Sequence, residues 1–328
     1  MKKIWTMVIV AAVLCNLAAC GNSQSTAKGA DKDEEAEEVV QEITREEITI
    51  SHKLGETTLT TNPEKVVVMD YGVLDALDYA GVDTVVGIPN SGHVPAELSK
   101  YESDDYAELG NLVEPNLETI NELQPDLIII TSRMTDYYED LSEIAPTLFM
   151  TMPAATYMET FEENMNILAQ VFPVQADSFS DQLDSIKERV EKVAEEAEGK
   201  SALLIQTNDD AINVFGIGSR YAAIYTDFGF TITDDSIAAS THGQSASFEY
   251  VAEQNPEYLF VIDRSAALST EGATGAEVLM DNALIKDIDA AKNDHIYYLN
   301  ATNWYTVAGG ISATSAMVGE IEEALGID

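Results

Sequence analysis

Short buried-type segments alternate along the chain with segments in which apolar residues recur at helical spacing. The segment 65–69 (KVVVM) predicts a strand, and Leu74, Leu77 and Ala80 predict a helix that ends before Gly81. Residues 84–87 (TVVG) predict the next short strand. Strands that alternate with helices in this way indicate an α/β fold with mostly parallel sheets.

A pattern of helix, proline, buried strand and arginine occurs twice in the chain. The first copy covers 117–133 and the second covers 248–264, with strands expected at 127–130 and 258–262. Corresponding residues differ in number by 131, namely Glu118 and Glu249, Pro125 and Pro256, and Arg133 and Arg264. Because helix, proline, strand and arginine match in order, the repeat predicts two lobes of like construction. Chance similarity is the alternative.

A long amphipathic helix is expected between Pro173 and Gly199. Its apolar residues are spaced by three and four positions and form one stripe, consisting of Phe179, Leu183, Ile186, Val190, Val193 and Ala197. At 1.5 Å per residue, about 24 residues span roughly 36 Å, which is enough to brace two lobes. We therefore expect an N-terminal lobe at 46–160, a connecting segment at 161–199 and a C-terminal lobe at 200–328.

The first 45 residues have the features of an export signal followed by a tether. Two lysines precede an apolar run at 7–19 that is too short to span a bilayer, which predicts a signal peptide over 1–19. The sequence LAACG at 17–21 resembles the lipobox of bacterial lipoproteins, so Cys20 would carry the lipid. An ordinary cleavage site with a chance cysteine is the alternative. Cys15 would be removed with the signal, which leaves no disulfide. Residues 20–45 are polar and acidic, as expected of a disordered tether.

The chain is strongly acidic. It has 58 Asp and Glu against 17 Lys and Arg in 328 residues, which gives a formal net charge of −41. This charge excludes binding to nucleic acid through a basic surface. It indicates a solvated, self-repelling surface and says little about the fold.

Arginine is the informative residue type, since the chain has only five. Arg133, Arg220 and Arg264 each follow a strand-like segment, and ligands of open α/β sheets bind at the carboxyl ends of the strands. Three guanidinium groups suit a rigid anion rich in oxygen atoms, because they stay charged and present paired donors. The alternative is that each arginine pairs with a carboxylate, for instance Arg264 with Asp263 or Asp235.

Three further segments carry a family resemblance. Residues 240–245 (STHGQS), 258–264 (YLFVIDR) and 302–305 (TNWY) are similar to the petrobactin-binding lipoproteins of Gram-positive bacteria. More broadly, the lipobox, the tether, the two α/β lobes and the long helix resemble class III solute-binding proteins. This resemblance covers nearly the whole chain after the signal peptide.

The resemblance implies a membrane-anchored receptor. Its ligand would be a ferric catecholate siderophore held between the lobes, with the iron wrapped by the chelator and no resident cofactor. Its partners would be the permease subunits of an ABC importer with a cytoplasmic ATPase. The protein would be a monomer, and the lipid on Cys20 would hold it on the outer face of the cell membrane. An acidic residue on each lobe would dock on the permease, which points to Glu118 and Glu249. A helix-dipole role is the alternative for both glutamates.

Aromatic side chains and one histidine are candidates to complete the ligand site. Tyr71 follows the first strand, and Trp304 and Tyr305 lie near the C-terminus; each suits either a cleft wall or the core. His242, in the loop at 240–245, is a candidate hydrogen-bond donor with a structural role as the alternative.

Two other functions remain open from the sequence. A haem or cobalamin carrier of the same fold would need a more apolar site, and a lipid-anchored surface hydrolase would use His242 and Ser245. No nucleophile elbow accompanies those two residues, and we expect no enzyme. Direct metal binding is not expected either, because the four histidines, His52, His93, His242 and His295, show no paired ligand spacing.

Overall fold

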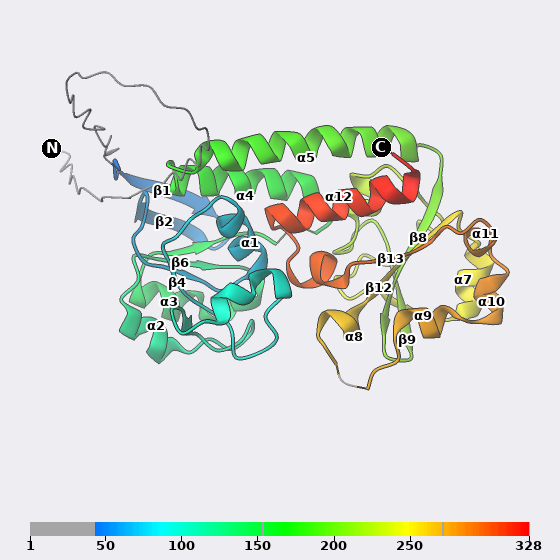
Figure 1. Cartoon of the computed structure of the whole chain (residues 1–328), viewed down its shortest axis with the longest axis horizontal. Helices are drawn as coiled ribbons and strands as arrows, with labels where there is room; N and C mark the ends of the chain where they lie inside the picture. Colours follow the sequence, from blue (N-terminus) through cyan, green and yellow to red (C-terminus); the bar gives the residue numbers. More distant parts are fainter. Residues whose placement is uncertain (1–42, 153, 271, 328) are drawn as a thin grey trace, which may run out of the picture. The chain divides into compact units, whose positions relative to one another are not determined.

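Two large β-sheets and a small two-stranded one organise the chain from residue 47 onward in the computed structural model, which describes residues 43–152, 154–270 and 272–327 (Figure 1). The predicted signal peptide, Cys20 and nearly all of the predicted tether lie outside the described residues.

The N-terminal sheet has five parallel strands in the order β5-β4-β3-β6-β7. Its strands are β3 (Val66–Val68), β4 (Val85–Ile88), β5 (Ala107–Glu108), β6 (Leu127–Ile130) and β7 (Thr147–Phe149). The helices of this lobe are α1 (Tyr71–Tyr79), η1 (Ala96–Glu102), α2 (Leu117–Leu123), η2 (Ser132–Tyr137) and α3 (Tyr138–Ile144). An antiparallel hairpin that the sequence did not predict, β1 (Glu47–His52) with β2 (Gly55–Thr60), precedes them.

The C-terminal sheet is mixed and has the order β11-β9-β8-β12-β13, with β10 beside β8. Its strands are β8 (Ser201–Asn208), β9 (Ala211–Phe215), β10 (Thr231–Ile232), β11 (Gln244–Ala246), β12 (Tyr258–Asp263) and β13 (Ile296–Leu299). β8, β10, β12 and β13 are parallel, whereas β9 and β11 pair in antiparallel fashion. The short helices of this lobe are α6 (Ala223–Thr226), α7 (Phe248–Gln254), α8 (Arg264–Ala267), α9 (Ala276–Met280), α10 (Ala283–Lys286), α11 (Asp289–Lys292) and the π-helical turn η3 (Thr302–Thr306).

Three longer helices join the two lobes. They are α4 (Tyr157–Val171), α5 (Ala176–Ala197) and α12 (Ile311–Leu325); α4 and α12 each pack on α5, and Figure 1 shows α5 extending over both lobes. The apolar stripe predicted for the long helix is confirmed, because all six of its residues are buried on α5. The prediction of two α/β lobes joined by one long helix is therefore confirmed, and α12 adds a second brace, because it packs on α5 and on α1.

Alternate residues of each sheet enter different cores. In β3, Val66 and Val68 face the core that contains α4, α5 and α12, whereas Val67 faces a second core in the N-terminal lobe. In β8, Leu204 faces the same large core, while Leu203 faces a third core in the C-terminal lobe. Burial on both faces explains why these strands read as continuous apolar runs.

The sequence repeat has a structural counterpart. Asn116 caps α2 by accepting a hydrogen bond from a backbone amide of the first turn, and Ser247 caps α7 in the same way. Gln124 and Asn255 end the two helices in the left-handed conformation, with φ of 48° and 42°. Each helix then leads into a central strand that has parallel neighbours on both sides. The two copies thus build equivalent parts of the two sheets.

Candidate ligand-binding site

The carboxyl ends of two central strands carry Arg133 and Arg264. Arg133 lies in η2, directly after β6, and Arg264 is the first residue of α8, directly after β12. Both side chains are partly buried. The sequence-based reason for placing these arginines at the ligand-binding edge of a parallel sheet therefore holds for this pair.

The same reason is wrong for Arg220, because β9 runs antiparallel to β8. The carboxyl end of β9 consequently lies away from the carboxyl ends of the parallel strands. The loop after β9 instead packs closely on the segment around Ile237, since a Cβ at Gly216 would lie 3.0 Å from the Ile237 carbonyl oxygen. This loop brings Arg220 to Tyr305 by another route.

Two of the arginines, Arg220 and Arg264, both contact Tyr305 in η3. The Nη2 of Arg220 donates to the backbone oxygen of Tyr305 at 3.1 Å, and its guanidinium carbon lies 4.3 Å from the Tyr305 ring centroid. The Nε of Arg264 donates to the Tyr305 hydroxyl at 3.1 Å, and its guanidinium carbon lies 5.5 Å from the same centroid. The structure thus brings Arg220, Arg264 and Tyr305 into one cluster.

Arg133 belongs to the same electrostatic neighbourhood. Burial alone would raise the pKa of Tyr305, but the hydrogen bond from Arg264 and the positive charges of Arg264, Arg220 and Arg133 together lower it. Arg133 comes from the N-terminal lobe and Tyr305 from the C-terminal lobe, so all three predicted arginines act on one phenol. The net effect favours negative charge at this position.

The three arginines differ in how their charge is compensated. Arg133 pairs with Asp70, with 3.3 Å between Nη1 and Oδ2. Among the described residues, neither Arg220 nor Arg264 forms an ion pair with a carboxylate; Arg264 donates instead to Asn208 Oδ1 at 3.0 Å. Two uncompensated guanidinium groups therefore remain in the C-terminal lobe.

Asp263, the neighbour expected as a partner of Arg264, is engaged elsewhere. Its Oδ1 accepts from the Ala266 amide and its Oδ2 from the Ala276 amide, so both oxygens serve backbone donors. Successive residues at a strand end project to opposite sides, which separates this carboxylate from the guanidinium beside it in sequence.

Tyr71 and Trp304 occupy the core. Both are 2% exposed. The Tyr71 hydroxyl donates to the Pro89 carbonyl, and the Trp304 indole N–H donates to Glu320 at 2.7 Å. Of the three aromatic candidates, Tyr305 alone contacts the predicted arginines.

The remaining candidates are exposed. His242 lies in the loop before β11, near Ser245 of that strand, and no hydrogen bond joins the two side chains within the described residues. Glu118 and Glu249 are each the second residue of their helix, α2 and α7. Among the described residues, no group of three or more His, Cys, Asp or Glu side chains is arranged to hold a metal ion.

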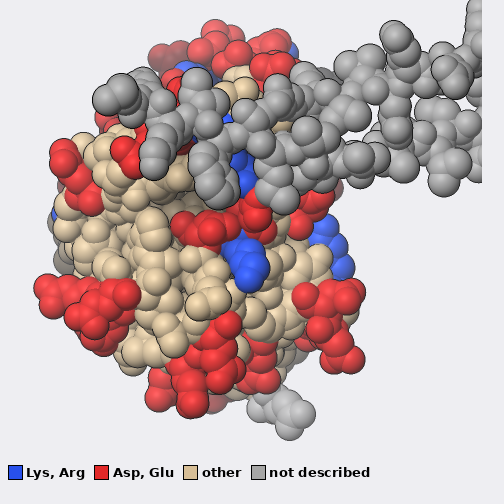
Figure 2. All heavy atoms as spheres, turned by 90° about the vertical axis from the view of Figure 1, so that its left-hand side faces the viewer, with Lys and Arg blue, Asp and Glu red and all other residues tan. Residues whose placement is uncertain are grey.

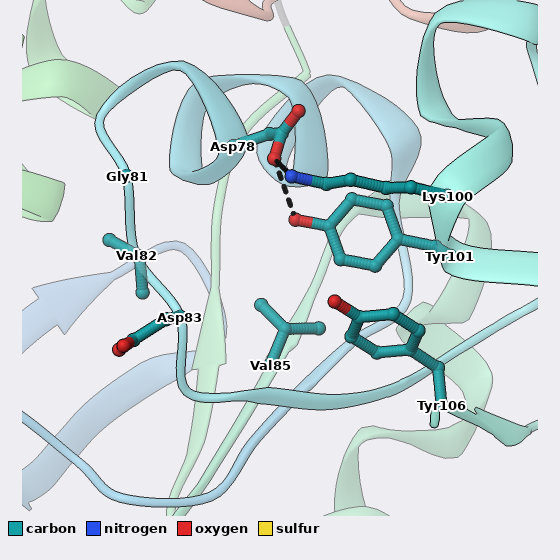
Figure 3. Close-up of a pocket in the computed structure, with 8 residues that line it drawn as sticks. All are labelled: Asp78, Gly81, Val82, Asp83, Val85, Lys100, Tyr101 and Tyr106. Carbon is teal, nitrogen blue, oxygen red and sulfur yellow. Dashed lines mark hydrogen bonds and ion pairs between the residues drawn. The ribbon is translucent and has the colours of Figure 1, made fainter. Parts of the chain in front are cut away.

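A small pocket of about 160 Å³ lies elsewhere in the N-terminal lobe (Figure 3). It is lined by Val82, Asp83 and Val85, which lead into β4, so it lies at the amino end of the strands, opposite Arg133. Its polar groups satisfy one another, because Asp78 accepts from the Tyr101 hydroxyl at 3.0 Å and pairs with Lys100. The pocket is therefore separate from the arginine cluster.

Sequence reasoning missed two residues that hold the arginines. Asp70 could have been predicted as an N-cap, because an aspartate between a strand and a helix is typical of that position. Nothing in the sequence indicated its hydrogen bond with Arg133. Asn208 is the last residue of β8, and no motif distinguishes it in the sequence.

The fold defines a class of protein: a two-lobe α/β binding protein with parallel sheets and a long connecting helix. The family described as Periplasmic binding protein matches residues 66–302, and the chain belongs to this family. This family is one of extracytoplasmic binding proteins, which confirms that the chain is not an enzyme.

The relatives support the predicted resemblance at a finer level. The chain is 38% identical to the petrobactin-binding protein YclQ of Bacillus subtilis over 99% of both chains, and 29% identical to the ferric-anguibactin-binding protein FatB of Vibrio anguillarum over 96% of this chain and 97% of FatB. The crystal structure of YclQ superposes with a TM-score of 0.81 at 40% identity, covering 85% of this chain and 99% of YclQ. The catecholate-siderophore-binding protein VctP of Vibrio cholerae gives 0.78 at 35% identity, covering 85% and 100%. The resemblance to siderophore-binding proteins is thereby confirmed.

No helix in the described ranges is both long enough and apolar enough to cross a bilayer.

Proposed function

We propose that this protein captures a ferric siderophore of the catecholate type, similar to petrobactin, and delivers it to the permease of an ABC importer. The names of its relatives support a ferric siderophore as the ligand class, since YclQ is a petrobactin-binding protein and VctP binds a catecholate siderophore. The iron arrives already wrapped by its chelator, so the protein needs no metal ligands of its own.

One observation carries this proposal: Arg220 and Arg264 converge on Tyr305 without carboxylate partners among the described residues. A ferric complex of catecholate groups carries about three negative charges on a rigid, oxygen-rich surface, which matches fixed guanidinium donors. In a chain of net charge −41, such a cluster is a local exception to the surrounding field.

The proposed contact set is Arg133, Arg220, Arg264 and Tyr305, which would line the cleft between the lobes. We include exposed His242 in this proposal as a hydrogen-bond donor to the ligand. We assign no ligand contact to Tyr71 and Trp304, because their rings are buried.

Two further proposals concern the partners. Exposed Glu118 and Glu249, at equivalent positions of the repeat, dock on the two permease subunits. A lipid on Cys20 anchors the protein to the outer face of the cell membrane, although this residue lies outside the described part of the chain.

The test is a titration of the purified protein with ferric petrobactin, a ferric hydroxamate, haem and cobalamin, followed by quenching of tryptophan emission. Trp304 adjoins Tyr305 in sequence and reports on this region. We expect tight quenching by ferric petrobactin alone. Binding of haem or cobalamin instead would overturn the assigned ligand class.

The arginines are tested in the same titration. Arg220→Ala or Arg264→Ala should weaken binding about ten- to hundredfold, the usual effect of losing a charged hydrogen bond. The triple alanine variant of Arg133, Arg220 and Arg264 should abolish binding. Arg189→Ala is the matched control, because Arg189 pairs with Glu322 on α12; it should lower stability and leave affinity unchanged. Retained affinity in the triple variant would refute the site.

A further inference from the structure

Asp70 links the N-terminal lobe's helix α1 to the arginine of the same lobe. It follows β3 and is the N-cap of α1, and its side chain is 4% exposed. Its Oδ1 accepts hydrogen bonds from the Gly72 amide at 2.9 Å and the Val73 amide at 3.2 Å. One carboxylate oxygen is thus fixed by the first turn of the helix.

The second oxygen of Asp70 serves the neighbouring strand. Oδ2 accepts from the Thr131 hydroxyl at 3.0 Å and from Arg133 Nη1 at 3.3 Å. Thr131 and Arg133 follow β6, which pairs with β3 in the sheet. The carboxylate therefore joins the ends of two adjacent strands and has donors on both oxygens, so its orientation is determined by four separate groups.

This arrangement fixes Arg133 before any ligand arrives. An arginine side chain has several rotatable bonds, and ordering it on binding costs conformational entropy. Arg133 is 19% exposed and acts electrostatically on Tyr305 of the other lobe, so one part of its guanidinium is held by Asp70 while its charge is felt at the cluster. Arg220 and Arg264 are held differently, by the neutral acceptors of Tyr305 and Asn208.

We propose that Asp70 is a positioning residue of the ligand site, which holds Arg133 in the orientation that receives the ferric chelate. This inference rests on the proposed function and deepens it. Asp70 does not touch the ligand; it acts through Arg133. The charge of Asp70 partly offsets that of Arg133, so this arginine contributes mainly directed hydrogen bonds, and Arg220 and Arg264 supply most of the net positive charge of the cluster.

Asp70→Asn tests the proposal with little change in shape. The asparagine side-chain oxygen still accepts from the Gly72 and Val73 amides, so α1 keeps its cap, whereas the new NH₂ group cannot accept from Arg133. We expect the affinity for ferric petrobactin to fall about tenfold. In an Arg133→Ala background the same substitution should cause no further loss, because the group through which it acts is gone.

Thr131→Val is a second variant, for use where Asp70→Asn fails to fold. It removes the hydroxyl that holds Oδ2 and leaves every charge in place. It should weaken binding severalfold, again only when Arg133 is present. Equal losses with and without Arg133, or an unchanged or increased affinity in Asp70→Asn, would overturn the proposal.

A readout without ligand separates this inference from the proposed function. The chain has five arginines, so their guanidinium NMR signals are few enough to assign by substitution. We expect the Arg133 signal to show restricted motion that is lost in Asp70→Asn, while the Arg189 signal stays unchanged. An Arg133 that is equally mobile in both proteins would refute the positioning role. A wild-type protein that binds no ferric chelate would refute the proposed function alone.

Discussion

A buried aspartate of α1 holds the first turn of α12. Asp75 is 5% exposed, and its Oδ2 accepts from the Ser312 amide at 2.7 Å. Gly310 directly precedes α12 and must lack a side chain, because a Cβ there would overlap the Asp75 carboxylate. Burial raises the pKa of Asp75 to about 6, although the hydrogen bonds from Ser312 and Ala313 oppose the rise.

This raised pKa predicts a defined pH dependence of stability. An unfolded aspartate has a pKa of about 4, so between about pH 4 and pH 6 the folded state binds more protons than the unfolded state. The contribution of Asp75 to the free energy of unfolding therefore falls as the pH rises through this interval, by up to about 3 kcal/mol. Denaturant titrations of the wild type and Asp75→Asn from pH 4 to pH 8 measure the difference.

The expected difference curve slopes between pH 4 and pH 6 and is flat above that. Asp136→Asn provides the control, because Asp136 is exposed and its substitution changes the charge of the chain by the same amount. A flat difference between the wild type and Asp75→Asn over the whole range would contradict the assignment.

At the scale of single residues, the sequence located the arginines but not their partners. Rarity in an acidic chain and position after strands were enough to select Arg133, Arg220 and Arg264. Arg133 can pair with Asp70 because β3 and β6 are neighbours in the sheet. The two strands are distant along the chain, since Asp70 and Thr131, whose side chains are hydrogen-bonded, lie 61 positions apart. The residues that surround either position in the sequence do not indicate such a contact.

At the scale of elements, periodic and buried segments were predicted well. The stripe on α5 and the repeated helices and strands followed from apolar spacing and from the constant offset of the repeat. The β1–β2 hairpin and β11 were missed, because short exposed or half-exposed strands carry few apolar residues. β9 was expected as a strand, but its antiparallel direction was not, and this made the stated reason for Arg220 wrong.

The equivalent helices α2 and α7 make the docking proposal testable. Glu118→Lys and Glu249→Lys should each reduce uptake of the ferric siderophore by cells at least severalfold, because docking through an acidic side chain requires a complementary charge on the partner. Neither change should alter the affinity of the purified protein for its ligand. Hydrogen bonds from its own backbone and from the Ser247 side chain lower the pKa of Glu249.

The same two helices supply the controls. Glu122 and Glu253 are exposed, lie one helical turn further along α2 and α7, and are themselves equivalent in the repeat. Their lysine variants change the net charge equally. If all four variants reduced uptake to the same extent, general electrostatics rather than docking would be responsible.

At the scale of the whole molecule, a strongly acidic chain carries the arginine cluster that we propose as the site of an anion. Figure 2 shows one face of the protein, on which Asp and Glu predominate over Lys and Arg. The repulsion from the net charge of −41 acts at long range, whereas the attraction of the arginines acts within the site. Added salt weakens the long-range repulsion more than the short-range attraction, because charges are screened beyond the Debye length.

The association rate should therefore rise with added salt at low ionic strength. Between about 0.01 M and 0.15 M salt the screening length falls from about 30 Å to about 8 Å, which removes the distant repulsion first. Stopped-flow measurement of tryptophan quenching by ferric petrobactin gives the rate. A rate that falls over this range would mean that the arginines dominate the long-range field, contrary to the charge distribution described here.

The contact of α12 with α1 also has a consequence for the order in which the molecule assembles. The largest core contains Leu74 and Leu77 of α1 together with Met317 and Ile321 of α12, so residues from opposite ends of the described chain complete one another. Closing this core joins segments that lie 237 positions apart at Asp75 and Ser312, which makes it a slow, non-local step of folding. The N-terminal lobe is therefore incompletely folded without α12, and the two lobes complete their folding together.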